Sequence, residues 1–487
     1  MEQNNHQQIT RREFIKTSAA AGAGVLVAGN GLFASTMQSR KKRYAIVGTG
    51  GRSKLYQGAI LNQYPEYAEL VGFCDVNLGR LQLAQNEARD INGSEIPVFL
   101  AEDFDKMVKE TRPDIVIVTT VDGFHHKYIL HAMELGCDVI TEKPMTIDHK
   151  NCQAIIDKQN ETGKSVRVTF NYRYSPPRSQ VKDILMSGAI GDILSVDFHW
   201  MLNTFHGADY FRRWHSQKKF SGGLMVHKAT HHFDLVNWWL SAVPVTVYAN
   251  GKREFYTPEM AKRFGLDSHH ERCHTCPEKT TCGFVLNLEK DKTLKRLYLD
   301  NEKYDGYFRD QCVFRPDIDI EDTMNVIVKY DNNVTMSYSL NAFNSWEGYY
   351  IIFNGTQGRL EHEIQEKIYI SGTDTEQGGI KEGGIKIRVI PLRGPAKDYK
   401  PWTGTGGHGG GDKLLLDDIF LPEKPEDKYK RAADFRSGAY SILTGIAANL
   451  SMRDKKIIQI PEIVKNLASP DYTNMPSHDA PLVMPGV

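Results

Sequence analysis

The chain has 487 residues, of which 40% are hydrophobic and 25% are charged. This length suggests two or three domains, and the composition is that of an ordinary globular protein. Lysine plus arginine and aspartate plus glutamate number 60 each, so the formal net charge is zero. Such a balance argues against partners that select strongly basic proteins, namely nucleic acids and anionic membrane surfaces.

The N-terminus is typical of an export signal. Arg11 and Arg12 precede Phe14 and Lys16, and a small, weakly apolar run follows at 19–34. This order predicts a twin-arginine signal with a linker over residues 1–40, and the apolar run is too short for a stable membrane span. The alternative is an accidental arginine pair before a flexible tail. No cysteine follows the run, so we expect no lipid anchor but export to the periplasm. Because this route exports folded proteins, any cofactor would be bound before export.

Residues 41–170 alternate between short apolar strands and helical stretches. That alternation predicts a doubly wound, parallel sheet. The expected strands are 44–47, 70–74, 115–119, 138–141 and 166–170, and the expected helices include 54–62, 127–135 and 151–162.

The remaining residues, 171–487, have a different character. Longer strands with alternating polarity, at 193–200, 324–330 and 334–340, predict a large and mostly antiparallel sheet in an α/β domain. A final helix at 431–450 and a last strand at 457–460 precede a proline-rich tail. A cysteine-rich insertion occupies about 255–312.

The turn after the first strand predicts a dinucleotide site. Gly48 and Gly50 match the first two glycines of G-x-G-x-x-G, and Ser53 takes the third position. Asp75, at the end of the second strand, is placed to accept hydrogen bonds from ribose hydroxyls, which favours NAD. Nearby arginines, Arg52 and Arg80, leave NADP open, and an ordinary tight turn is the structural alternative. The turn residues expected at the cofactor are Gly48, Gly50, Gly51, Arg52 and Ser53.

Several motifs occur in the order seen in one family. They are T-V-D-x-x-H at 120–125, E-K-P at 142–144, N-Y-R-Y-S-P at 171–176, a glycine- and histidine-containing segment at 221–234, and N-G-T-Q-G at 354–358. The chain thus resembles the Gfo/Idh/MocA oxidoreductases, although Val121 replaces the family's proline. The resemblance implies a Rossmann domain followed by an α/β substrate domain. It adds four residues to the expected cofactor site: Thr120, His125, Glu142 and Lys143.

Three residues are the candidates for catalysis. Lys143 follows a strand end, where the crevice of such a sheet lies, and the resemblance makes it a proton relay or oxyanion stabiliser. Pro144 after it is a candidate for a cis peptide. His231 falls on the family's histidine, and His227 replaces its aspartate. The two histidines are four residues apart in a predicted helix, so a metal-binding pair and stacked core histidines are the alternatives.

Aromatic and polar side chains after residue 170 are candidate sugar contacts. His408 lies in a glycine run, 406–412, that resembles a stretch of the NAD-dependent N-acetylgalactosaminidases; the alternative is a flexible loop. The expected substrate-binding residues are Tyr172, Arg173, His206, Tyr210, Arg213, Trp214 and His408.

Four of the seven cysteines cluster in the insertion. Their spacing, C-x2-C and then single cysteines, suggests a tetrahedral zinc site. An iron–sulfur cluster or two disulfides are the alternatives. The expected metal ligands are Cys273, Cys276, Cys282 and Cys312.

The residues favour an NAD(H)-dependent oxidoreductase with tightly bound cofactor that acts on a hydroxyl of a sugar or glycoside, for example at C3. The second hypothesis is an NAD-dependent glycoside hydrolase that oxidises its substrate transiently and eliminates the aglycone. A non-catalytic sugar-binding protein on the same fold is the third. We expect a homo-oligomer with a small-molecule substrate, no nucleic-acid partner and no stable membrane span after export.

Overall fold

The computed structural model describes residues 40–484, except 372, 374, 375, 425, 477, 478, 480 and 483. The predicted export signal lies outside the described residues. Among the helices described, none combines the length and the apolar character needed to cross a membrane.

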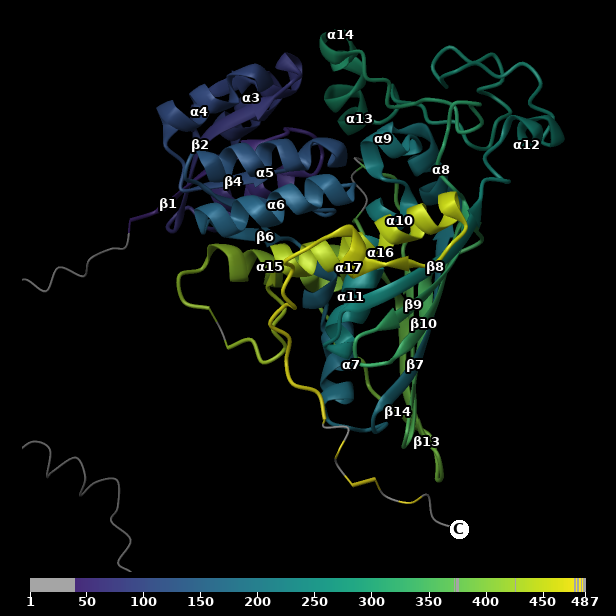
Figure 1. The fold of residues 1–487 in the computed structure, drawn as a ribbon. Helices are drawn as coiled ribbons and strands as arrows, with labels where there is room; N and C mark the ends of the chain where they lie inside the picture. Colours follow the sequence, from purple (N-terminus) through teal and green to yellow (C-terminus); the bar gives the residue numbers. More distant parts are fainter. Residues whose placement is uncertain are drawn as a thin grey trace, which may run out of the picture. The chain divides into compact units, whose positions relative to one another are not determined.

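The first sheet is the predicted doubly wound one. Its order is β15-β6-β5-β4-β1-β2-β3, and all neighbours are parallel except β15, which a late segment of the chain adds to the edge (Figure 1). The strands are β1 (Lys42–Val47), β2 (Ala68–Asp75), β3 (Val98–Leu100), β4 (Ile115–Val118), β5 (Asp138–Thr141), β6 (Val166–Val168) and β15 (Ala433–Asp434).

Both faces of this sheet are buried, as the apolar strands predict. In β1, Ala45 and Val47 pack into one hydrophobic cluster, whereas Tyr44 and Ile46 pack into another on the opposite face. Helices cover both faces, and Asn77 and Asp148 cap two of them through side-chain oxygens. The covering helices are α2 (Ser53–Gly58), continued by the π-helix η1 (Ala59–Gln63), α3 (Leu78–Asn92), α4 (Phe104–Thr111), α5 (His125–Glu134) and α6 (His149–Thr162).

The second sheet has nine strands in the order β14-β13-β12-β11-β7-β10-β9-β8-β16. Every pairing is antiparallel except that of β7 with β10, so the predicted architecture is confirmed. The strands are β7 (Ile193–Asn203), β8 (Pro244–Lys252), β9 (Thr323–Tyr330), β10 (Thr335–Asn344), β11 (Glu347–Gly355), β12 (Gly358–Glu366), β13 (Ile380–Pro391), β14 (Lys397–Asp398) and β16 (Ile458–Gln459).

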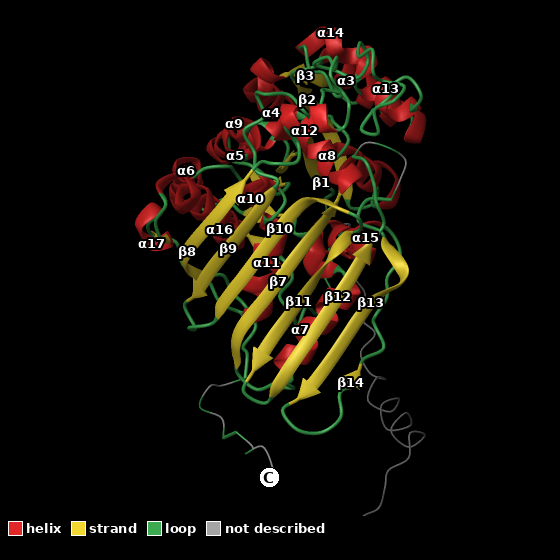
Figure 2. Cartoon of the chain, turned by 90° about the vertical axis from the view of Figure 1, so that its right-hand side faces the viewer, coloured by secondary structure: helices red, strands yellow, loops and turns green. Residues whose placement is uncertain are grey.

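Burial alternates along these strands because only one face is covered by helices. Figure 2 shows the strands in front and helices behind them. The helices of this part are α7 (Pro176–Met186), α8 (Thr204–Arg212), α9 (Lys218–Ser221), α10 (Leu224–His227), α11 (Thr230–Leu240), α15 (Gly407–Phe420), α16 (Phe435–Asp454) and α17 (Ile460–Ile463), with the 3-10 turns η3 (Asp122–Phe124), η4 (Asn171–Tyr174) and η5 (Trp214–Ser216).

The insertion forms a small helical substructure with its own hydrophobic cluster. Leu286, Leu288, Leu294, Leu297 and Tyr298 build that cluster. Its helices are α12 (Pro258–Arg263), α13 (Lys292–Leu297), the 3-10 turn η6 (Leu299–Asn301) and α14 (Glu302–Asp305). In Figure 1, α13 and α14 lie beside α3 of the first sheet.

One local prediction was wrong. The helix expected through 226–234 is interrupted, since α10 ends at His227 and α11 begins at Thr230. The glycine run, for which a flexible loop was the alternative, forms the start of α15 at Gly407. It is nevertheless kinked, with His408 and two glycines in left-handed conformations.

Helix α16 crosses α10 at Gly445. A Cβ there would lie 2.1 Å from the carbonyl oxygen of Met225, so Gly445→Ala must push the helices apart even though alanine favours helix. We expect the free energy of unfolding to fall by about 1–3 kcal/mol, measured by urea denaturation. Gly58→Ala is the control, because its added Cβ meets no atom within 4 Å. Equal losses in the two variants would contradict this account.

Candidate functional site

A large cavity of about 1550 Å³ runs between the two sheets and under the insertion. Its volume exceeds that of a typical pocket for one small ligand. At one end it is lined by the glycine-rich turn and by strand ends of the first sheet, here called the cofactor cleft (residues 48–52, 75–91 and 119–125). At the other end it is lined by histidine, lysine and aromatic side chains of the second part, here called the polar pocket (residues 172, 206–215, 227–231 and 408).

The glycine-rich turn fits a dinucleotide. Gly48 has φ +90°, and a Cβ on it would lie 2.7 Å from the backbone of Thr119. A Cβ on Gly50 would meet nothing within 4 Å, which leaves the open space that a pyrophosphate needs. Ser53 does not line the cavity. Its hydroxyl donates to the carbonyl of Gly50 at 2.7 Å, so it shapes the turn without reaching the cofactor.

Asp75 lies at the end of β2, as predicted, and lines the cleft. Its carboxylate accepts hydrogen bonds from the backbone N–H of Thr49 at 2.6 Å and of Asn77 at 2.8 Å. Arg80 approaches it at 3.3 Å and also bonds Asp305 of the insertion at 2.5 Å. The positive charge of Arg80 is therefore balanced by two carboxylates.

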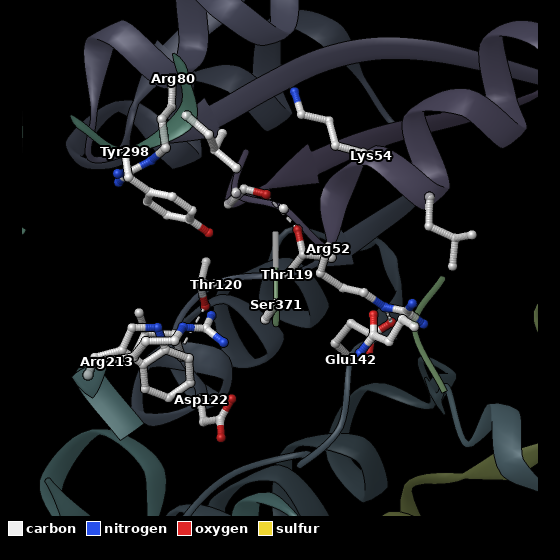
Figure 3. A pocket seen from close by; sticks show the side chains of 18 of the residues that line it. Arg52, Lys54, Arg80, Thr119, Thr120, Asp122, Glu142, Arg213, Tyr298 and Ser371 are labelled. Atoms are coloured by element: carbon white, nitrogen blue, oxygen red, sulfur yellow. Dashed lines mark hydrogen bonds and ion pairs between the residues drawn. The ribbon is translucent and has the colours of Figure 1, made fainter. Parts of the chain in front are cut away.

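Glu142 is fixed at the other side of the cleft. It accepts hydrogen bonds from Arg52 and from the hydroxyl of Tyr56, each at 2.6 Å. Burial alone would raise the pKa of Glu142, but the charge of Arg52 and these hydrogen bonds lower it below its ordinary value. Glu142 is thus an anion directly before Lys143 in the chain (Figure 3).

Two loops of the cleft meet at His125. Its ring nitrogens lie 2.7 Å from the carbonyl oxygen of Pro144 and 3.1 Å from that of Thr120. The peptide between Lys143 and Pro144 is cis, as expected. His125 therefore connects the E-K-P turn to the loop after β4, while Thr120 lines the cleft.

Lys143 points from the first sheet toward the second part of the chain. Its ammonium group donates to the backbone carbonyl of His227 at 3.1 Å. Burial lowers the pKa of Lys143 to about 8, against the opposing effect of the carboxylates of Asp122 and Glu142. The residue is therefore able to gain and lose a proton near neutrality.

The imidazole of His227 is held by a carboxylate from the first sheet. Its Nδ1 lies 2.5 Å from Oδ2 of Asp122, in η3. Burial raises the pKa of Asp122 and lowers that of His227. When Nδ1–H donates to Asp122, Nε2 is left as the acceptor. Sequence reasoning quoted Asp122 only as part of a motif and assigned it no role.

His231 occupies a different helix from His227 and stacks on Tyr172, with ring centroids 4.4 Å apart. Its Nδ1 is buried and has no hydrogen-bond partner among the described residues. Burial and the neighbouring cations lower its pKa well below the ordinary value, so the ring is neutral. His408 lies 6.5 Å away between ring centroids and bonds Asp412 at 2.8 Å.

Models of one family match the chain in order. The model described as "Oxidoreductase family, NAD-binding Rossmann fold" matches residues 42–170, and "Oxidoreductase family, C-terminal alpha/beta domain" matches residues 182–460. The chain belongs to the Gfo/Idh/MocA oxidoreductase family. A twin-arginine translocation signal also matches, at residues 8–28, which confirms the predicted export signal.

Relatives within the family differ in their named activities. The Bacillus subtilis oxidoreductase YteT is 35% identical over 83% of this chain and 94% of its own length. Glycosyl hydrolase family 109 protein 1 of Akkermansia muciniphila is 30% identical over 53% of this chain and 57% of its own length. Among solved structures, the WlbA dehydrogenase of Bordetella pertussis in complex with NADH and UDP-GlcNAcA shares the fold. Its TM-score is 0.56 at 19% identity, over 86% of this chain and 99% of WlbA.

Most of the candidate sugar contacts named from the sequence line the polar pocket. His206 bonds Glu347 at 2.8 Å and accepts from Tyr210 at 3.1 Å. Arg213 lies 3.6 Å from Asp209. The residues that line the pocket are Tyr172, His206, Tyr210, Arg213, Trp214 and His408, together with His215 and Lys228, which sequence reasoning missed.

Arg173 does not reach the pocket. Its guanidinium is 1% exposed and makes a two-point ion pair with Asp234, at 2.8 and 2.6 Å. The expected sugar contact is thus corrected to a buried structural pair. Asp234, in α11, is held in this pair and does not line the cavity.

The insertion does not show the expected metal centre. Among the described residues, no three His, Cys, Asp or Glu side chains are placed to hold a metal, and all seven cysteines are free thiols. Cys273 instead accepts from the backbone N–H of Leu286 at 3.5 Å, and Cys312 from that of Phe314 at 3.5 Å. Burial raises the pKa of Cys312 to about 11, which favours the protonated thiol. Neither zinc, iron–sulfur nor disulfides are supported at Cys273, Cys276, Cys282 and Cys312 among the described residues.

Proposed function

We propose that this protein is an NAD-dependent oxidoreductase that acts on a hydroxyl group of a sugar or glycoside in the periplasm. The observation that carries the proposal is the continuity of the cavity. One space joins the glycine-rich turn to Lys143 and to the histidines of the polar pocket. A cofactor in the cleft would thus meet a substrate beside a group that exchanges protons near neutrality. The export signal supports the compartment, and a homo-oligomeric state stays a prediction.

The charges around Arg80 favour NAD over NADP. A 2′-phosphate needs a free cation beside the adenosine ribose. Arg80 is already paired with Asp75 and Asp305, so the net charge at this position is negative. A phosphate placed there would face two carboxylates, whereas ribose hydroxyls would find acceptors.

Lys143 is the residue assigned to proton transfer. When bound, NAD supplies the acceptor for the hydride that leaves the carbinol carbon. The hydroxyl proton then passes to the neutral amine of Lys143, whose pKa of about 8 suits both directions. The carbonyl of His227 fixes the position of that amine, and the charges of Asp122 and Glu142 favour its protonated form.

The two histidines orient the reacting hydroxyl. Nε2 of His227 is an acceptor because Asp122 holds the proton-bearing nitrogen. His231, neutral and stacked on Tyr172, offers a ring nitrogen that has no hydrogen-bond partner in the described part of the chain. Aromatic faces around them suit the apolar faces of a sugar ring.

A net hydrolysis is the second candidate, and one observation favours it. His408 and Asp412 form a second acid–base pair in the same cavity, close to His231. Such a pair is suited to protonate a leaving aglycone after oxidation has acidified a neighbouring C–H bond. The likeness to a family 109 glycosyl hydrolase points the same way.

Product analysis separates the two reactions. The purified protein, with its bound nucleotide quantified after denaturation, is incubated with a panel of glycosides. We expect a keto-glycoside and one reduced nucleotide per turnover for the oxidoreductase. Free sugar and aglycone with unchanged nucleotide would identify the hydrolase, and NADP or no reaction with any glycoside would contradict the proposal.

Asp122→Asn tests the dyad. The amide accepts more weakly from His227 and carries no charge, so the imidazole loses its fixed orientation. We expect the single-turnover rate of nucleotide reduction to fall by about 10²–10⁴-fold, with a much smaller change in substrate affinity. Asp105→Asn is the matched control, because Asp105 pairs with the exposed His131 on the same domain. A wild-type rate in Asp122→Asn would remove the dyad from the mechanism.

The pKa of Lys143 sets a pH dependence. Oxidation requires the neutral amine, so the single-turnover rate should rise with pH, reach half its maximum near pH 8 and level off above it. Reduction in the reverse direction requires the ammonium and should fall through the same midpoint. Lys143→Met should abolish this titration and lower the rate by about 10²–10⁴-fold. A profile with the same midpoint in Lys143→Met would assign the titration to another group.

A further inference from the structure

Part of the insertion is built against the cofactor cleft. Residues 286–307, here called the clamp, contain α13, η6 and α14, and they lie along α3, the helix that follows Asp75. Figure 1 shows α13 and α14 beside α3. The clamp does not belong to the alternating strand–helix pattern of the nucleotide domain, yet it provides part of the cavity wall.

The contacts between clamp and nucleotide domain are specific. Asn77 donates its side-chain amide to the backbone carbonyl of Asn301 at 2.9 Å. Gly79, two residues later, lets the clamp approach closely, because a Cβ there would lie 2.0 Å from Oδ1 of Asn301 and 2.6 Å from the ring of Tyr304. Leu83 joins the hydrophobic cluster of the clamp. These groups lie on the first turns of α3, next to the position of the adenosine ribose.

Ion pairs flank the contact between the clamp and α3. Arg296 pairs with Glu87 of α3 at 2.8 Å, and Lys54 of α2 pairs with the same carboxylate. Asp305 pairs with Arg80. Glu87 thus connects the helix after the glycine-rich turn, α3 and the clamp.

The clamp also presents side chains to the cavity. Leu297, Tyr298 and Asp305 line it opposite the glycine-rich turn. Figure 3 shows Tyr298 beside Arg80, with its hydroxyl directed into the space between them and Thr119. An adenosine bound beside Asp75 would therefore have a wall of the insertion on its outer side.

We propose that the clamp completes the adenosine-binding subsite and retains the nucleotide, so that NAD loaded before export does not dissociate afterwards. This proposal rests on the assignment of the cleft to NAD. In an open Rossmann cleft the adenosine faces solvent on one side, whereas here release requires the contacts at Asn301, Arg296 and Asp305 to open. The insertion is thus a nucleotide-binding element, in place of the metal centre that its cysteines suggested.

The test is the rate at which nucleotide leaves the full-length protein. NAD is bound to saturation, excess free nucleotide is removed, and release is followed after addition of a fluorescent NAD analogue. Gly79→Leu places a side chain where Asn301 and Tyr304 lie, while leucine favours the helix. Arg296→Ala removes the pair with Glu87. Lys295→Ala is the matched control on the same helix, because Lys295 pairs with Asp300 inside the clamp.

We expect release to be at least about tenfold faster in Gly79→Leu, faster in Arg296→Ala and unchanged in Lys295→Ala. Circular dichroism and rebinding of added NAD check that the nucleotide domain stays folded. Wild-type release rates in both Gly79→Leu and Arg296→Ala would overturn the proposal. If the wild type binds no NAD at all, the proposed function itself is rejected, and the clamp proposal with it. If NAD binds but exchanges rapidly in the wild type, only the clamp is rejected.

Discussion

One residue of the second part of the chain, His227, holds the two groups of the nucleotide domain on which the site depends. Its backbone carbonyl accepts the ammonium of Lys143, and its imidazole bonds the carboxylate of Asp122. The contact with Asp122 is buried and that with Lys143 is partly buried, so both need close complementarity between the two parts of the chain. Helix α10 must therefore lie at a defined distance from the cleft. Gly445 of α16 permits that position, because a glycine leaves room for the carbonyl of Met225.

Burial explains why these polar groups are functional candidates. Removing Lys143, His227 and His231 from water disfavours their charged forms and lowers each pKa. The two imidazoles are then neutral, Lys143 exchanges its proton near neutrality, and all three face a cavity in which interactions with a substrate hydroxyl are not weakened by solvent. Two of the carboxylates that line the cavity are engaged elsewhere, Glu142 with Arg52 and Asp412 with His408. The pocket thus keeps its proton acceptors available.

The structural features that depend on local sequence patterns could be predicted from the sequence. Apolar strands ending at Val47, Asp75 and Thr141 define the edge of the first sheet. Lys143 follows one of these strand ends, so the sequence alone predicts that it lies in the crevice. Features that depend on long-range contacts were missed. Arg173 looks like a sugar ligand until Asp234, from another helix, is seen to bind it. The cysteine spacing suggests zinc, but spacing does not reveal how the side chains are placed, and among the described residues no three potential ligands are placed to hold a metal.

The effect of replacing the family's aspartate by His227 also depends on a long-range contact. Taken alone, it removes a carboxylate from the catalytic region. The structure supplies one from the other domain, since Asp122 contacts the imidazole that took the aspartate's place. A carboxylate–histidine pair spanning two domains makes the acceptor geometry depend on domain contact, which a single aspartate would not. The clamp extends that dependence to the cofactor. It belongs to the insertion in the second part of the chain, and we propose that it encloses the adenosine end of the cleft. Cofactor retention and proton transfer therefore both depend on how the second part of the chain packs on the first.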